Sequence, residues 1–142
     1  MKATTATIRI TNLRLRTYIG FNPDERRKQQ DVVINAEIRH RLQPGALCDE
    51  VDAALNYKVI TKAVIRHVEE GRFLLLEKLA NDLLEIICRE ASVTQATVTV
   101  DKPHALRFAD SVSLTLEYDQ QQATHTSENR DENYPRPLSK AS

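Results

Sequence analysis

The 142-residue chain has few of the residues that define special classes of protein, with two cysteines, three glycines and no tryptophan. Two cysteines, Cys48 and Cys88, are too few for a disulfide framework, and neither has neighbours at the spacing of a metal site. Cys88 lies in an apolar helical pattern, which is typical of a buried and unreactive thiol. The sequence therefore predicts neither a disulfide scaffold nor a metal centre.

An excess of charge of one sign is also absent, because 20 basic and 20 acidic residues give a formal net charge of +0. Proteins that bind nucleic acid or anionic membranes usually carry a clear basic excess. The sequence also has no apolar run of signal-peptide length and none that could span a bilayer. We therefore expect no nucleic-acid and no membrane partner, and we expect a cytoplasmic protein with a single domain.

Four segments alternate apolar and polar residues, a pattern that predicts strands with one buried face. They cover residues 6–19, 32–38, 96–101 and 111–117. The first two are close in sequence, so a hairpin is the simplest pairing. The alternation therefore predicts a sheet whose first two strands are neighbours and whose last two follow much later in the chain.

Between these strand pairs the apolar residues change to helical spacing, over residues 56–69 and 75–91. Gly71 suits a helix end or the short turn after it. The order β-β-α-α-β-β predicts an α+β fold, a four-stranded antiparallel sheet with two helices on one face. Residues 121–142 are too polar to stay ordered alone, so we divide the chain into a domain of residues 1–120 and a disordered tail.

The second face of the predicted sheet is polar but carries little charge. Its residues are Thr7, Arg9, Thr11, Asn35, Glu37, Thr97, Thr99, Ser113 and Thr115. A simple solvent-exposed face usually carries more lysine and glutamate, and the two open edges of such a sheet favour pairing with other chains. Closure of several copies into a ring would pair the edges and leave this face lining a channel. The alternative is an ordinary two-layer monomer.

Two charged residues beside loops suggest chemistry, although each has an ordinary structural explanation. Glu77 near a helix start is favoured by the helix dipole, or it accepts two parallel hydrogen bonds from a pterin or guanine edge. Lys102 at a strand end is a solvated lysine, or a general acid–base, with His104 and Arg107 nearby in sequence as further positive charge.

Two further candidates are weaker when each is taken alone. Tyr57 at a helix start is either a packed aromatic residue or a phenol that relays a proton, and Glu25 lies in a loop with Pro23. No phosphate-binding glycine loop, dinucleotide motif, zinc spacing or nucleophile elbow is present. The individual residues therefore leave the reaction open.

Together these stretches resemble the dihydroneopterin aldolase family over residues 6–118. The matching pieces are Ile19-Gly20 followed by Glu25, Leu55-Asn56-Tyr57, Arg72-Phe73 followed by Leu76-Glu77, and Asp101-Lys102-Pro103. The resemblance implies the tunnelling fold, in which subunits close a tetrameric barrel and two rings usually stack into an octamer. It also implies active sites between neighbouring subunits.

The resemblance implies a role for each candidate residue. Glu77, with Leu76 before it, would anchor a pterin substrate, and Lys102 would be the catalytic lysine. Tyr57 would reach the site of a neighbouring subunit, and Glu25 would be the loop glutamate of the catalytic group. The implied chemistry is a retro-aldol step in which the dihydropterin itself accepts the electrons, so no metal and no cofactor are expected.

Within the family, residues 104–113 resemble the branch that epimerises 7,8-dihydroneopterin triphosphate at C2' to 7,8-dihydromonapterin triphosphate. His104 and Arg107 are then candidates for binding the substrate's triphosphate, whereas Pro103 is more typical of aldolases. The alternative within the family is an aldolase of folate synthesis, which releases glycolaldehyde and 6-hydroxymethyl-7,8-dihydropterin. An alternative of another class is a non-catalytic pterin-binding ring, which the complete set of candidate residues disfavours.

Overall fold

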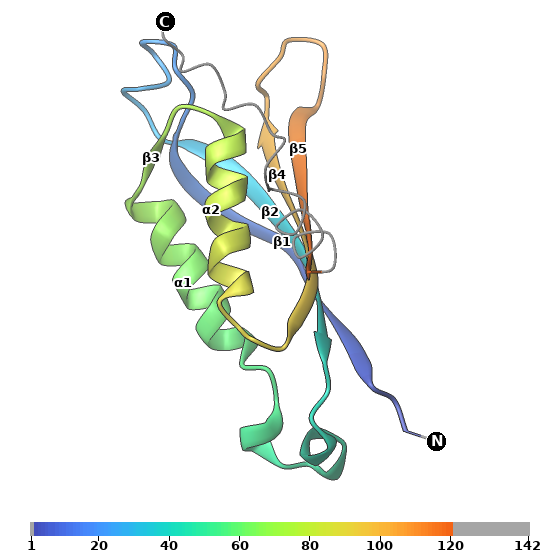
Figure 1. Ribbon diagram of the computed structural model, residues 1–142. Coiled ribbons are helices and arrows are strands. Elements are labelled where there is room, and N and C mark those ends of the chain that lie inside the picture. The colour runs from blue at the N-terminus through green and yellow to red at the C-terminus, as the bar shows by residue number, and fades with distance from the viewer. Residues whose placement is uncertain (1, 121–142) are drawn as a thin grey trace, which may run out of the picture.

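The computed structural model describes residues 2–120 of the chain as one sheet covered by two helices (Figure 1). The proposed tail, residues 121–142, lies outside the described residues. The elements are β1 (Thr5–Ile19), β2 (Gln30–Arg41), the short 3-10 turns η1 (Pro44–Cys48) and η2 (Val51–Ala53), α1 (Tyr57–Glu70), β3 (Arg72–Phe73), α2 (Leu76–Cys88), β4 (Val93–Pro103) and β5 (Ser111–Asp119).

The sheet has the strand order β3-β1-β2-β4-β5. The four predicted strands are all present, and β2 pairs antiparallel with both β1 and β4, as β4 does with β5. The structure adds β3, which pairs parallel with the end of β1 and is extended by a hydrogen bond from Gly20 N to Phe73 O of 2.9 Å. A two-residue strand is too short to show an alternation, so the sequence pattern gave no sign of it.

A bulge in β1 explains why its apolar positions change from even to odd numbers between Ile10 and Leu13. Asn12 has a φ of 55°, in the left-handed region that asparagine tolerates better than most residues. Its N–H donates to Asn35 Oδ1 at 2.8 Å, and Asn35 Nδ2 donates back to Asn12 Oδ1 at 3.3 Å. The extra residue keeps the apolar side chains on either side of it on the same sheet face.

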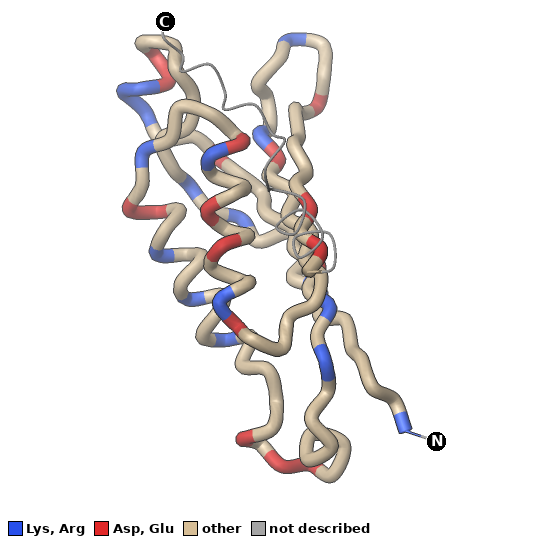
Figure 2. Tube along the Cα trace, viewed as in Figure 1, with Lys and Arg blue, Asp and Glu red and all other residues tan. Residues whose placement is uncertain are grey.

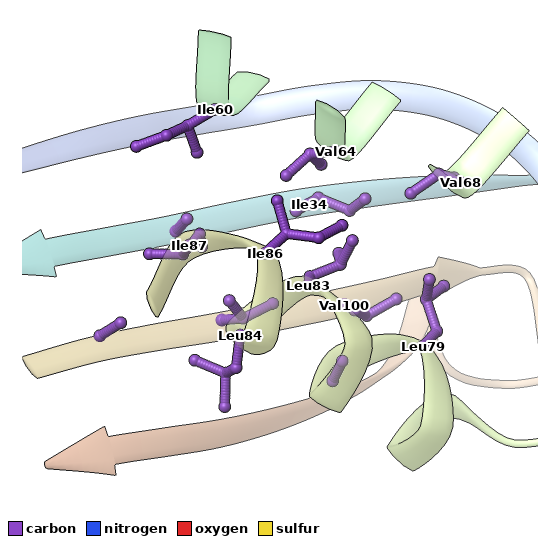
Figure 3. Packing of buried hydrophobic residues seen from close by; sticks show 14 of the residues in the cluster. Ile34, Ile60, Val64, Val68, Leu79, Leu83, Leu84, Ile86, Ile87 and Val100 are labelled. Carbon is purple, nitrogen blue, oxygen red and sulfur yellow. The ribbon is translucent and has the colours of Figure 1, made fainter. Parts of the chain in front are cut away.

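Both predicted helices are confirmed, and they cover one face of the sheet (Figure 1). The buried residues of α1 are Ile60, Val64 and Val68, which recur every four positions and so form one stripe. Leu79 and Leu83 of α2 are fully buried beside them (Figure 3). The core therefore lies between the helices and the apolar sheet face.

A polar cluster joins the two helices at the edge of this core. Asp82 of α2 lies 2.8 Å from both His67 Nε2 of α1 and Lys78 Nζ. Burial alone raises the pKa of Asp82, but the hydrogen bonds from Lys78 and His67 outweigh it and hold that pKa below the usual range.

On the same helix, burial raises the pKa of the Cys88 thiol to about 11, which agrees with the predicted unreactive cysteine.

The predicted polar face is also confirmed by the strand register. One row across the sheet runs Arg9, Glu37, Thr97, and Arg9 Nη2 lies 3.1 Å from Glu37 Oε1. Neither helix lies on this face, and among residues 2–120 strand β5 has a neighbouring strand on one side only. Within that range no helix combines the length and the hydropathy needed to cross a membrane. Ring closure through the sheet edges stays a prediction.

The buried hydroxyl of Thr17 gives a test of how β1 and α1 are joined. It donates to Val68 O at 2.6 Å and lies 3.3 Å from Gly71 O, at the end of α1. Thr17→Val removes the donor but keeps the shape, so we expect the free energy of unfolding to fall by about 1–3 kcal/mol. Urea denaturation at fixed protein concentration measures this, with Thr11→Val on the exposed face as the matched control. Equal stability of the two variants would show that the Thr17 hydrogen bond to the end of α1 does not stabilise the fold.

Candidate active site

Lys102 is buried against the core face of the sheet. It continues the alternation of Val98 and Val100 on β4, and only 9% of its surface is exposed. Its ammonium group donates a hydrogen bond to Glu25 Oε2, from the connection between β1 and β2. Of the two readings left open by the sequence, the solvated lysine is therefore wrong. The structure brings together two of the predicted site residues that are 77 positions apart.

The Glu25 carboxylate is held by several neighbours besides Lys102. Gln30 Nε2 lies 3.5 Å from Oε2 and also donates to Ile19 O at 2.7 Å. Lys102 is the largest cause that holds the pKa of Glu25 below its usual value, and the N–H of Asn22 and then Gln30 lower it further, against the effect of burial. Glu25 is therefore an ionised acceptor that fixes the position of the ammonium group.

Gly20 leaves the space that this arrangement needs. Its φ is +130°, a conformation that side chains rarely adopt, and an added Cβ would overlap the Glu25 carboxyl group. The glycine therefore lets the loop fold back so that Glu25 covers the end of β1.

Glu77 and Leu76 begin α2, at the same end of the molecule as the Glu25–Lys102 pair. Figure 1 shows the start of α2, the β1–β2 connection and the end of β4 at that end of the sheet. The hydrogen bond from Gly20 to Phe73 fixes the segment just before α2 against the end of β1. Glu77 is exposed and Leu76 is half-buried, so both are available to a ligand there.

Tyr57 lies at the opposite end of α1 from the Thr17 contact. It is the first residue of α1, after the Asn56 side chain that accepts from Val59 N at 3.2 Å and starts the helix. The helix has 14 residues. At 1.5 Å per residue it therefore separates Tyr57 by about 20 Å from the helix end near Thr17. The phenol is 51% exposed, and its own chain does not bring it to Lys102.

His104 and Arg107 lie in the exposed β4–β5 connection. His104 has a φ of 62°, and its N–H donates to Asp110 O at 3.1 Å, which closes the loop. The Arg107 guanidinium lies 5.6 Å from the ring centre of Phe108, which is itself fully exposed. Neither side chain has a hydrogen bond to the Glu25–Lys102 pair within residues 2–120. Their role in substrate binding stays a prediction.

Sequence reasoning did not identify Gln30 as part of the site. It stands at the start of β2 beside Gln29, and nothing in that pair distinguishes a structural glutamine from an exposed one. Over residues 2–120 the structure shows no group of three or more His, Cys, Asp or Glu side chains placed to hold a metal ion.

A curled, mainly antiparallel sheet with two helices on one face and a buried lysine–carboxylate pair at its end defines an α+β subunit of the tunnelling-fold class. The family model described as dihydroneopterin aldolase matches residues 8–117. The chain therefore belongs to the dihydroneopterin aldolase family.

Individual relatives divide between the two activities of this family. The chain is 50% identical to the dihydroneopterin triphosphate 2'-epimerase of Escherichia coli, over 80% of this chain and 94% of that protein. It is 29% identical to the dihydroneopterin aldolase of the same organism, over 76% of this chain and 88% of that protein. A structure of Escherichia coli dihydroneopterin aldolase in complex with neopterin has a TM-score of 0.74 and 27% identity, over 80% of this chain and 98% of that one.

The lowered pKa of Glu25 predicts a pH dependence of stability. Because the folded protein lowers this pKa below 4.5, the ionised carboxylate stabilises the fold above about that pH. The contribution is lost as the pH falls through the lowered value. We expect wild type to be more stable than Glu25→Gln at pH 7 and the difference to disappear in acid, as measured by denaturant unfolding from pH 7 to pH 3. A difference that stays constant down to pH 3 would show that the charge of Glu25 is not the cause.

Proposed function

We propose that the protein epimerises 7,8-dihydroneopterin triphosphate at C2', giving 7,8-dihydromonapterin triphosphate by retro-aldol and aldol steps. The observation that carries the chemistry is the buried hydrogen bond between Lys102 and Glu25. The choice of the epimerase is supported by 50% identity to one Escherichia coli enzyme against 29% to the aldolase. The proposal includes the cytoplasmic location expected from the sequence.

In the first step a base removes the proton of the 2'-hydroxyl group and the C1'–C2' bond breaks. The bonding electrons pass into the C6=N5 imine of the dihydropterin, and N5 gains a proton. Lys102 handles the protons at N5 and at the hydroxyl, helped by ordered water. Glu25 holds the ammonium group in place, because its lowered pKa keeps it ionised at neutral pH.

The pterin ring binds at the start of α2. Glu77 accepts two parallel N–H groups from the pterin edge, and the exposed carboxylate in the first helical turn is free to do so. Tyr57 comes from a neighbouring subunit, since its own chain places it at the far end of α1. The site is therefore shared, and a tetrameric ring, stacked as an octamer, is part of the proposal.

Epimerase and aldolase reactions share the intermediate formed after bond cleavage. An aldolase protonates it and releases the aldehyde, whereas an epimerase keeps the aldehyde, lets it turn and re-forms the bond. Retention of the fragment therefore decides the product. His104 and Arg107 are proposed to contribute positive charge towards the triphosphate, and the aldolase reaction is the alternative outcome.

Mixing two inactive variants tests the shared site. We expect Lys102→Ala to lower turnover by about 100-fold or more, because it removes the group that handles protons. Tyr57→Phe is expected to lower turnover in the same assay. Dissociation and random reassembly of the two variants would place an intact Lys102 beside an intact Tyr57 at about a quarter of the sites in a ring.

Activity recovered in the mixture, and absent from each variant treated alone, would support the shared site. Reassembly of Lys102→Ala with Glu25→Gln is the matched control, because both residues lie in one chain and no intact site is regained. Gel filtration that finds a monomer at micromolar concentration would exclude the ring, and full activity of Lys102→Ala would exclude the mechanism.

Product analysis tests the reaction and the role of Arg107. With 7,8-dihydroneopterin triphosphate we expect mainly the C2' epimer, and with dihydroneopterin we expect slower turnover and more glycolaldehyde. Arg107→Ala should raise the KM for the triphosphate by about ten-fold, with little change for the free alcohol. Equal effects on both substrates would remove Arg107 from the phosphate site. Faster turnover of dihydroneopterin than of the triphosphate, with glycolaldehyde as its main product, would make the protein an aldolase.

A further inference from the structure

A cavity of about 320 Å³ lies between the end of β1, β3 and the β1–β2 connection. It is lined by Tyr18, Gly20, Arg26, Arg72, Phe73 and Leu74. Gly20 belongs to both places, because it lines this cavity while its α-carbon lies against the Glu25 carboxyl group. The cavity and the Glu25–Lys102 pair therefore meet at Gly20, and the cavity extends from there towards the β3 edge of the sheet.

Within residues 2–120, neither arginine of this cavity forms an ion pair with a carboxylate. The Arg72 guanidinium is stacked 3.8 Å from the ring centre of Tyr18, and its Nη1 donates to Arg26 O at 3.3 Å. The Arg26 side chain has no hydrogen-bond or ion-pair partner among residues 2–120. Figure 2 shows basic residues of the β1–β2 connection next to β3 at this end of the molecule. One guanidinium is held rigidly and the other is free to move onto a ligand.

The cavity beside His104 differs from this one because acidic residues balance its arginines. Its arginines, Arg14 and Arg16, are offset by Asp31 and Glu69, which line the same cavity, and Arg16 Nη1 lies 2.9 Å from Asp31 Oδ1. A polyanion gains little from a site whose positive charges are already neutralised. The two guanidiniums beside Gly20 have no ion pair within the described part of the chain, so they make the stronger anion site of the two.

We propose that Arg26 and Arg72 form the subsite that holds the triphosphate of the substrate, an inference that rests on the proposed function. Guanidinium groups donate paired N–H bonds that match phosphate oxygens. After the C1'–C2' bond breaks, the triphosphate remains on the aldehyde fragment, at C3'. The subsite keeps this fragment beside Lys102 and Glu25 until C1' attacks it again. The uncharged fragment of dihydroneopterin has no such anchor and escapes.

Kinetics and product ratios of variants test this subsite. Arg26→Gln removes a side chain without a partner in residues 2–120, so the fold is retained, and Arg72→Ala removes the stacked one. Each should raise the KM for the triphosphate by about ten-fold and leave that for dihydroneopterin within about two-fold. The product from the triphosphate should shift from epimer towards released aldehyde. Arg89→Ala, at the exposed far end of α2, is the matched control.

Binding of inorganic tripolyphosphate provides a measurement that does not depend on turnover. By calorimetry, wild type should bind it with an affinity that falls as salt rises, and Arg26→Gln should bind it at least about ten-fold more weakly. A wild-type protein that prefers dihydroneopterin over its triphosphate would overturn the proposed function. The binding of tripolyphosphate would still test whether the cavity is an anion site. Normal triphosphate preference, product ratio and tripolyphosphate binding in both variants would overturn the subsite and leave the epimerase standing.

Discussion

A buried ammonium group needs a partner, and this requirement shapes the catalytic end of the protein. Lys102 falls on the core face of β4 because it continues the alternation of Val98 and Val100. An unpaired charge there would cost several kcal/mol, so the fold has to supply a carboxylate. The β1–β2 connection does so by folding Glu25 back over Gly20, whose φ of +130° suits only glycine. In the proposed mechanism, the interaction that satisfies the buried charge also positions it for proton transfer.

The same geometry limits what one chain can do alone. Helix α1 carries Tyr57 away from Lys102, because its 14 residues separate Tyr57 by about 20 Å from the helix end near Thr17. The sheet leaves one side of β5 unpaired within residues 2–120, and its helix-free face is lined by small polar residues. In the proposed ring, the sheet edges pair between copies and Tyr57 of one chain reaches the Lys102 site of the next. In the function proposed here, catalysis therefore requires assembly of the ring.

Electrostatics provides the difference between two reactions that share an intermediate. The chain has a formal net charge of +0, yet its charges are unevenly placed. On the polar sheet face Arg9 pairs with Glu37, and Arg16 pairs with Asp31. Within residues 2–120, Arg26 and Arg72 form no ion pair, and they line a cavity that reaches Gly20 beside Glu25. The proposed subsite would retain a charged fragment and release a neutral one, which would link the phosphorylation of the substrate to the identity of the product.

The sequence by itself determined the elements and their order, because the spacing of apolar residues along a strand or a helix shows which side chains are buried. It also determined the family, through short motifs around Glu25, Tyr57, Glu77 and Lys102. Only the tertiary structure decided that β3 joins the sheet, that Glu25 meets Lys102 and that Arg26 meets Arg72. These contacts join residues far apart in the chain, through loop conformations that no periodic pattern records. Burial is encoded residue by residue, whereas the pairing of charges depends on how the whole chain packs.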